Sequence, residues 1–458
     1  MQVEETLPVW SIIPFVGMLL SIAIFPLVKE KWWEGHQLHV AAFWSVVFLV
    51  PFCLGYGIEE TAVDLMEVII LDYVPFIALL FGLFVVAGGI NLRGTVVGTT
   101  KNNVVLLLIG TALSSIIGTT GAAMLMIRPV IRANAWRKNK VHLVVFFIFL
   151  VANIGGCLTP LGDPPLFLGY LRGIPFFWTL EHLWPLFLVN VAVLTGVFAL
   201  VDHRFLKKEV REGRSPAHIT GHDGVIVPIR IEGAHNFAFI ALIIAGVILN
   251  GSLPQMEGLI DPGTGQIFGI SLHEGVHLGL NYFVQLAFIV VATVLSLKTT
   301  KRQIREHNGF EWGPIAEVAR LFIGIFITMI PALILLRAHG GSLGIDTPLE
   351  FFWATGSLSS FLDNSPTYVV FLTTAGSLGI AADVFTSVGF VGTLDLIAIS
   401  AGAVFMGAMT YIGNAPNFMV KSIAEKSGIK MPSFFGYMAW SLAILVPLFI
   451  VDSLIFFR

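Results

Sequence analysis

Long apolar runs recur along the chain, and short polar or basic segments separate them. An α-helix rises 1.5 Å per residue, so about 20 apolar residues cross a hydrocarbon core about 30 Å thick. Most of these runs are long enough for such a crossing. The pattern predicts ten membrane-spanning helices, at residues 7–28, 38–57, 73–90, 141–165, 183–201, 236–250, 280–297, 315–336, 393–417 and 433–452.

Two further apolar stretches, 103–131 and 348–374, carry polar residues at mid-length. Polar side chains at that depth are costly in lipid, which argues against one ordinary span in either stretch. We therefore expect each stretch to be a re-entrant hairpin that enters and leaves on the same side.

Composition supports a membrane protein. Of the 458 residues, 56% are hydrophobic and only 12% are charged, and the mean hydropathy is +0.86. A soluble domain usually carries about twice that share of charge. We expect the lipid bilayer as a partner and no nucleic acid. The first run begins after acidic residues and lacks the basic start of a signal peptide, so it is taken as a span.

Basic residues predict the orientation of these spans. With the two hairpins treated as re-entrant, lysine and arginine gather on one side, whereas the opposite loops hold only Arg172, Arg337 and Arg458. An acidic loop from Glu59 to Asp72 also falls on that opposite side. The positive-inside rule then places the basic side in the cytoplasm and both termini in the periplasm of a bacterial cytoplasmic (inner) membrane.

A polar stretch divides the chain into two similar parts. Residues 1–201 hold five spans and the hairpin 103–131, residues 202–235 form a cytoplasmic linker, and residues 236–458 hold five spans and the hairpin 348–374. An odd number of crossings turns the second part upside down. The predicted fold is therefore an all-α polytopic membrane protein with two inverted-topology repeats, each five transmembrane helices plus a hairpin.

The two parts also share motifs. The segment SSIIGTT that begins at Ser114 aligns with SSFLDNS at Ser359, and TPLGDPP at Thr159 aligns with TYIGNAP at Thr410. The second pair interrupts the spans 141–165 and 393–417, because several prolines and glycines cannot all lie within one regular helix. Paired Gly/Pro interruptions in corresponding positions indicate the binding site of a secondary transporter.

A broken helix leaves backbone carbonyl groups without partners at membrane depth, and a small hard cation such as Na⁺ or Li⁺ can bind them. The hairpin tips add neutral oxygen ligands at Thr119, Thr120, Asn364, Ser365 and Thr367. Helix N-termini at the same interruptions can instead hold an anion. The scaffold alone therefore permits a cation, an anion or both.

Two acidic residues favour the cation. Asp163 lies in the first interruption and Asp363 at the second hairpin tip, and a carboxylate at membrane depth can exchange a proton for a cation. Asp163 could instead cap the following helix or pair with Arg128, for which we expect a counter-ion role. Glu317 is a third proton-carrying candidate, although it can simply pair with Arg320 one turn away.

At these residues the chain resembles the ion transporter superfamily, which includes citrate and dicarboxylate carriers, arsenite permeases and NhaD-type Na⁺/H⁺ antiporters. The stretches ANIGGCLTPLGDPPLF (152–167), SSFLDNSPT (359–367), GNAPN (413–417) and EVARLFIGIF (317–326) look most like the NhaD-type branch. The resemblance covers nearly the whole chain. It implies a homodimer with a scaffold domain and a transport domain that moves by an elevator-like alternating access.

The resemblance also implies a cation site between each hairpin tip and the facing interruption. One site would use Thr119, Thr120, Thr159, Gly162 and Asp163, and the other Asp363, Asn364, Ser365, Thr410, Gly413 and Asn414. Dicarboxylate carriers place Ser-Asn-Thr at both tips, but the first tip here lacks the asparagine, so that site is expected to be weak or to serve only the proton. Asp363 would repel a carboxylated substrate.

One motif suggests a different function. His273-Glu274-Gly275-Val276-His277 spells HExxH, which on a helix binds zinc in metalloproteases. Here it falls in a glycine-rich outside loop without a clear third ligand. We therefore expect no enzyme, no structural zinc and no cofactor. The leading hypothesis is a Na⁺(Li⁺)/H⁺ antiporter of NhaD type, and the alternative is a Na⁺-coupled citrate or dicarboxylate carrier.

Overall fold

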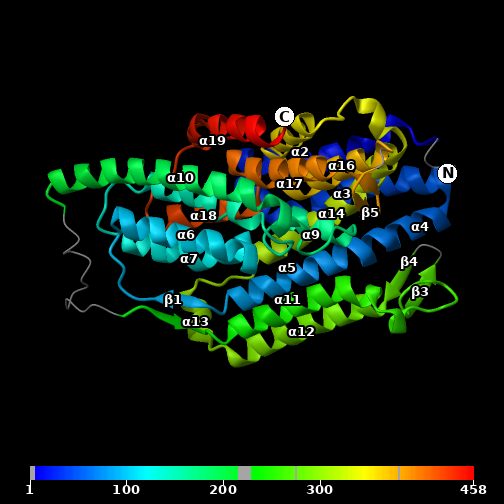
Figure 1. The fold of residues 1–458 in the computed structure, drawn as a ribbon, viewed down its shortest axis with the longest axis horizontal. Coiled ribbons are helices and arrows are strands. Elements are labelled where there is room, and N and C mark those ends of the chain that lie inside the picture. Colours follow the sequence, from blue (N-terminus) through cyan, green and yellow to red (C-terminus); the bar gives the residue numbers. More distant parts are fainter. Residues whose placement is uncertain (1–5, 215–227, 274–275, 380–381) are drawn as a thin grey trace.

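The computed structural model describes residues 6–214, 228–273, 276–379 and 382–458. It is an all-α polytopic membrane protein (Figure 1). The helices before the linker are α2 (Ile13–Val28), α3 (Glu30–Tyr56), α4 (Ile58–Glu67), α5 (Val74–Ala87), α6 (Thr100–Ile117), α7 (Thr119–Ala133), α8 (Val141–Leu150), α9 (Pro164–Leu171) and α10 (Trp178–Arg211).

After the linker the order of long, paired and interrupted helices is the same. These helices are α11 (Asn236–Ser252), α12 (Leu280–Thr299), α13 (Arg302–His307), α14 (Gly313–His339), α15 (Pro348–Ser359), α16 (Asn364–Ser377), α17 (Thr393–Met406), α18 (Ala415–Lys426) and α19 (Phe434–Phe456).

Nine helices in the described part of the chain are long and apolar enough to cross a membrane. Eight of them correspond to the predicted uninterrupted spans, and the ninth is α6, the first arm of the predicted hairpin 103–131. The predicted spans 141–165 and 393–417 are the two that fall short, because their apolar helices end at the interruptions.

The acidic segment that was predicted as a loop is helical. Residues Ile58–Glu67 form α4, and a π-helical turn, Val68–Tyr73, joins α4 to α5, so one apolar helix runs from Ile58 to Ala87. Glu59 and Glu60 lie in its first turn, where the helix dipole favours negative charge. The acidic residues are thus compatible with a helix that extends past the apolar layer.

In the described part of the chain, short strands between the helices form three two-stranded sheets. The strands are β1 (Asn91–Arg93), β2 (Arg230–Glu232), β3 (Gly269–His273), β4 (Val276–Gly279), β5 (Val384–Thr386) and β6 (Gly389–Val391). β1 pairs antiparallel with β2, which fixes the end of the linker against the loop after α5. The linker also begins later than predicted, because α10 continues past residue 201 to Arg211.

Each hairpin is a pair of helices joined at a sharp reversal. Gly118 links α6 to α7 with φ of 80°, a conformation that other residues adopt only at a cost. The second hairpin joins α15 to α16 through residues 360–363, and Asp363 is the N-cap of α16. Both reversals fall at the polar positions that predicted them.

The interrupted helices form the centre of the molecule. Every side chain of α8 from His142 to Leu150 is buried, and so is every side chain of α17 from Leu396 to Met406. A helix that is apolar all round belongs in such a fully enclosed place. In contrast, α3 exposes large apolar side chains, among them Phe43 and Leu54, as expected of a helix that faces lipid.

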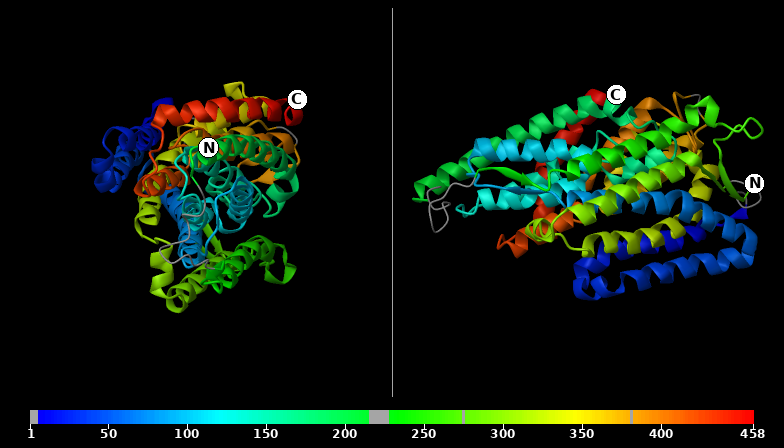
Figure 2. Two further views of the ribbon diagram at one scale, coloured as in Figure 1. Left: turned by 90° about the vertical axis from the view of Figure 1, so that its left-hand side faces the viewer. Right: turned by 90° about the horizontal axis from the view of Figure 1, so that it is seen from below.

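The helices form two groups (Figures 1 and 2). In one group α14 packs against α2, α3 and α5, and α5 packs against α11 and α12. The other group contains both hairpins and both interrupted helices, covered by α10 and α19. The two groups meet where α14 packs against α16 and where α5 contacts α7 and α9.

Candidate functional site

The hairpins and interruptions of the two parts meet at the centre of the second group. Helix α16 from the second hairpin packs against α9, which follows the first interruption. Helix α7 from the first hairpin packs against α18, which follows the second interruption. One arm of each hairpin therefore contacts an interrupted helix from the other part of the chain.

The first hairpin is fastened to the first interruption by serine and threonine. Ser114 Oγ donates to the Val151 carbonyl at 2.6 Å, and Ser115 Oγ donates to the Gly155 carbonyl at 2.5 Å. At the tip, the Thr119 amide donates to the Gly162 carbonyl at 2.8 Å. The hairpin thus satisfies part of the carbonyl groups that the interruption frees, which were expected to be available to an ion.

The second hairpin makes equivalent contacts. Ser359 Oγ donates to the Ala403 carbonyl at 2.7 Å, and Ser360 Oγ donates to the Met406 carbonyl at 3.2 Å. Thr410 Oγ1 donates to the Ser360 carbonyl, as Thr159 Oγ1 does to the Ser115 carbonyl. The aligned motifs therefore make matching hydrogen bonds in both parts.

Glycine permits the tight course of both interruptions. A side chain on Gly162 would overlap the backbone of Gly156, and one on Gly413 would lie 2.6 Å from the Gly407 carbonyl oxygen. Gly413 also donates its amide to Thr410 Oγ1 at 3.1 Å. These glycines let the chain fold back on itself between the two halves of each helix.

Asp163 occupies the point where the elements converge. Its side chain is 1% exposed. Oδ1 accepts from Thr119 Oγ1 at 3.0 Å and from Asn414 Nδ2 at 3.2 Å, and Oδ2 accepts from Asn364 Nδ2 at 2.7 Å. Both hairpin tips and the second interruption thus each supply one neutral donor to a carboxylate from the first interruption.

The two alternative roles of Asp163 are not seen. It stands at the N-cap position of α9, but its side chain makes no capping hydrogen bond. Arg128, predicted as its counter-ion, instead donates to the Asn308 carbonyl at 2.6 Å, because α7 directs this arm toward the loop between α13 and α14. Among the described residues, the hydrogen-bond partners of Asp163 are uncharged.

Asp363 has a different environment. Its Oδ1 accepts from the Ser365 amide at 3.0 Å and so caps α16, and its carbonyl accepts from Thr367 Oγ1 at 3.0 Å. The residue that follows it, Asn364, is the one that contacts Asp163. The two acids thus differ, because side chains hold the Asp163 carboxylate and a helix N-terminus holds that of Asp363.

Of the remaining predicted residues, Thr120 and Ser365 lie at the hairpin tips, and Glu317 lies away from Asp163. Thr120 is half-buried in the first turn of α7, and Ser365 is fully buried beside Asn364. Glu317 lies in the other group of helices and accepts from Gln37 Nε2 at 2.6 Å, which joins α14 to α3. The structure does not bring Glu317 into the cluster around Asp163.

Two asparagines that are linked to Asp163 only through Asn414 were not predicted from the sequence. Asn153 precedes the 3₁₀ turn of the first interruption, and Asn417 lies in the first turn of α18. Asn153 Nδ2 donates to Asn417 Oδ1 at 2.7 Å. Both belong to stretches that carry the family resemblance, so the signal was present, but neither aligns with a polar partner in the other part.

The described residues of the HExxH motif lie in strands. His273 ends β3, and Val276 and His277 begin β4, while Glu274 and Gly275 lie outside the described residues. His277 contacts Ser271 Oγ at 2.9 Å and the Ile267 carbonyl at 2.8 Å. No group of three potential metal ligands occurs among the described His, Cys, Asp and Glu side chains.

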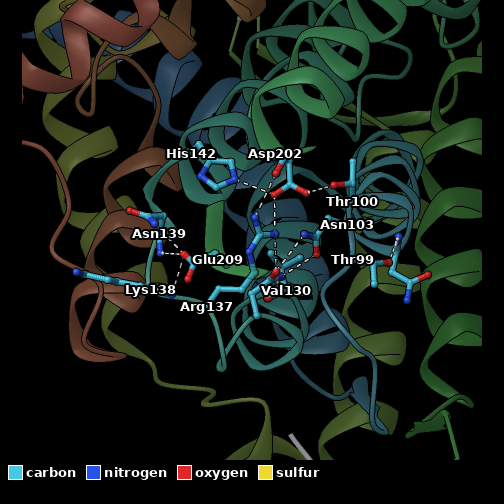
Figure 3. A network of polar contacts seen from close by, with 12 residues as sticks. Thr99, Thr100, Asn103, Val130, Arg137, Lys138, Asn139, His142, Asp202 and Glu209 are labelled. Atoms are coloured by element: carbon cyan, nitrogen blue, oxygen red, sulfur yellow. Dashed lines mark hydrogen bonds and ion pairs between the residues drawn. The ribbon is translucent and has the colours of Figure 1, made fainter. Parts of the chain in front are cut away.

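A second buried polar network lies at the end of the first hairpin that is away from its tip (Figure 3). Asp202 on α10 accepts from Arg137 at 2.7 Å and from Thr100 at 2.7 Å, and contacts His142 Nε2 at 2.8 Å. Nearby, Glu209 accepts from the backbone amides of residues 138 and 139. The network ties α10 to α6 and to the loop before α8, which holds the hairpin against its interrupted helix.

Comparison with known proteins agrees with this architecture. The family model described as "Putative citrate transport" matches residues 4–457, nearly the whole chain. No curated protein matches the chain. Together with the multi-pass helical fold, the match fits the ion transporter superfamily and indicates a transporter rather than an enzyme. The chain belongs to this family of secondary transporters, described as acting in citrate transport.

Proposed function

We propose that the protein is a Na⁺(Li⁺)/H⁺ antiporter in which Asp163 carries either a proton or the cation. The observation that supports this proposal best is the environment of the Asp163 carboxylate, which is buried and receives only neutral donors among the described residues. A buried charge without a counter-charge is costly. A proton or a small cation relieves that cost, and the two compete for the same oxygens.

Further ligands for the cation are close to Asp163. The amide oxygen of Asn364 and the hydroxyl oxygen of Thr119 come from the two hairpin tips. Such oxygen donors suit a small hard cation. Asp363, which caps α16 one residue before Asn364, places a second carboxyl group near the site, and among the described residues none of its hydrogen bonds reaches Asp163.

An elevator-like movement would let the site face each side in turn. The matching serine and threonine contacts support an assignment of the two parts as inverted repeats. Because both hairpins are fastened to their interruptions, the second group of helices would move as one body past the first group. We further propose a homodimer in a bacterial cytoplasmic membrane, with both termini in the periplasm.

Na⁺-coupled transport of citrate or a related carboxylate is the second candidate, and the family description favours it. The amide and hydroxyl donors that hold Asp163 would also hold a substrate carboxylate. However, the Asp163 carboxylate already occupies those donors, and a polyanion would meet its charge. The geometry therefore favours cation exchange.

Everted membrane vesicles separate the two functions. A pH gradient is formed first, and Na⁺ or Li⁺ is then added without any organic acid. The antiporter predicts collapse of the gradient by either cation in wild-type vesicles and no collapse in Asp163→Asn vesicles. If collapse requires citrate, or if labelled citrate enters together with Na⁺, the second candidate is correct.

A further inference from the structure

Three asparagine side chains form a continuous chain of hydrogen bonds that ends at Asp163. Asn417 Nδ2 donates to the Gly407 and Thr410 carbonyls at 2.8 and 2.9 Å. Asn153 Nδ2 donates to the Ile148 carbonyl at 2.8 Å and to Asn417 Oδ1 at 2.7 Å. Asn414 Nδ2 lies 3.2 Å from Asn153 Oδ1, from the Ala152 carbonyl and from Asp163 Oδ1.

Backbone carbonyl groups fix the orientation of every amide in this chain. A carbonyl oxygen can only accept, so the atom that faces it must be the amide nitrogen. Each of the three asparagines faces at least one such carbonyl, and all three are fully buried. Asn414 therefore presents its N–H group to Asp163 and cannot turn its oxygen there without placing oxygen against oxygen.

Asn364 contacts the other carboxylate oxygen of Asp163, and its side chain is held much less firmly than that of Asn414. Its Nδ2 donates to Asp163 Oδ2 at 2.7 Å, and its Oδ1 has the Ser365 hydroxyl at 3.5 Å. Among the contacts of the described residues, no backbone carbonyl faces this amide. Rotation about its last bond would exchange nitrogen for oxygen beside Asp163 at the cost of these two contacts.

We propose that Asn153 and Asn417 are positioning residues that clamp the two interruptions together and make Asn414 a permanent donor to Asp163. As a consequence, a cation binds on the side of Asn364, between Asp163 Oδ2 and the amide oxygen of Asn364 after that amide has turned. An N–H group repels a cation, so the Asn414 side is closed to it. This inference rests on the proposed cation exchange.

Neither Asn153 nor Asn417 contacts Asp163, and their effect passes through Asn414. Partners that orient the ligands of an ion typically change its affinity by roughly 10–100-fold when they are replaced. Asn153→Ser and Asn417→Ser are therefore expected to raise the KM for Na⁺ by about 10-fold or more. The maximal rate should change less, because the carboxylate that exchanges the ion is still present.

The control is Asn236→Ser. Asn236 is also fully buried and bonds to Gly89, Ser296 and Thr300, but it lies on α11 in the other group of helices. Loss of stability alone would reduce the amount of folded protein and the maximal rate in all three variants. A raised KM for Na⁺ in the Asn153 and Asn417 variants only is the result that the clamp predicts.

A crossed pair of substitutions provides a second, independent test in the full-length protein. Asn364→Asp and Asn414→Asp each add one negative charge beside Asp163 and each replace an NH₂ group by an oxygen atom. The proposal predicts that Asn364→Asp retains saturable Na⁺ exchange, because the oxygen ligand remains. Asn414→Asp should lose it, because a carboxylate would face the Ala152 carbonyl, Asn153 Oδ1 and Asp163 at once.

Unchanged KM values in both serine variants, or equal behaviour of the two aspartate variants, would overturn the clamp. These outcomes leave wild-type exchange intact and so differ from failure of the proposed function. If wild-type vesicles show no response to Na⁺ or Li⁺, cation exchange itself is refuted, and the inference is refuted with it.

Discussion

The substitution Asp163→Asn changes only the charge at the centre of the proposed site. The new amide oxygen can still accept from Thr119 and Asn414, as Oδ1 of Asp163 does. Its NH₂ group would face the NH₂ group of Asn364, so we expect the Asn364 amide to turn and accept. The three hydrogen bonds at residue 163 can then be re-formed, which makes the variant a mimic of protonated Asp163.

Stability measurements give this prediction a magnitude. A ligand that binds only the folded state stabilises it by RT ln(1 + [L]/Kd), which is about 2.7 kcal/mol at 100 times Kd. Wild-type protein should therefore gain about that amount when Na⁺ is raised far above its Kd, which is several degrees in Tm. Asp163→Asn should gain nothing, and without Na⁺ it should be at least as stable as wild type, because a buried charge is gone.

The assay is thermal unfolding of the purified protein at increasing NaCl, with choline chloride at equal ionic strength. Asp363→Asn is the matched control, because asparagine caps a helix as well as aspartate does and the Asp163 cluster is untouched. It should keep a Na⁺-dependent rise in Tm, smaller than that of wild type because one carboxylate near the site is gone. A rise in Asp163→Asn equal to that of wild type would refute the assignment of Asp163.

Other predictions concern the framework of the site. Gly118→Ala places a side chain at φ of 80° and should destabilise the protein by about 1–2 kcal/mol in thermal unfolding, whereas no loss would mean that the hairpin tip relaxes freely. Asp202→Asn breaks the buried pair with Arg137 and should cost about 3–5 kcal/mol with little effect on the KM for Na⁺; a loss of stability near zero would contradict the buried network. The hydrogen bond from Asn91, with the ion pair to Arg93, holds the pKa of Glu232 below its ordinary value of 4.5. The ionised Glu232 carboxylate therefore stabilises the β1–β2 contact fully above pH 4.5, and this stabilisation is lost as the pH falls through the lowered pKa. Hydrogen exchange at residues 91–93 should report the loss, and Glu232→Gln should remove the pH dependence.

Much of the fold could be predicted because the bilayer restricts the choices. Lipid forces spanning segments to be helical, so apolar length located each long helix, and polar residues or proline located the reversals and interruptions. Helix ends were less predictable: α10 runs on to Arg211 and α4 contains the acidic segment. Outside the apolar layer a helix can continue in water, and hydropathy then no longer marks its end.

The site was only partly predictable, because its contacts join residues far apart in the chain. The sequence identified Asp163, Asn364 and Asn414 from their positions in paired motifs, but it could not distinguish Asp163 from Asp363. Both acids stand at a helix N-cap position, and they differ because the Asp363 side chain caps its helix whereas the Asp163 side chain meets side chains from the other part. Arg128 was misassigned for the same reason, since a long arm can reach several partners and only packing decides among them.

Mutually exclusive binding of a proton and a cation at Asp163 can be measured directly by titrating the purified protein with Na⁺ in weakly buffered solution while released protons are recorded. Near the pH at which Asp163 is protonated without Na⁺, we predict that Na⁺ binding releases protons and that the release is absent in Asp163→Asn. Saturable Na⁺ binding without proton release at any pH, or proton release that persists in Asp163→Asn, would contradict the exchange at this carboxylate.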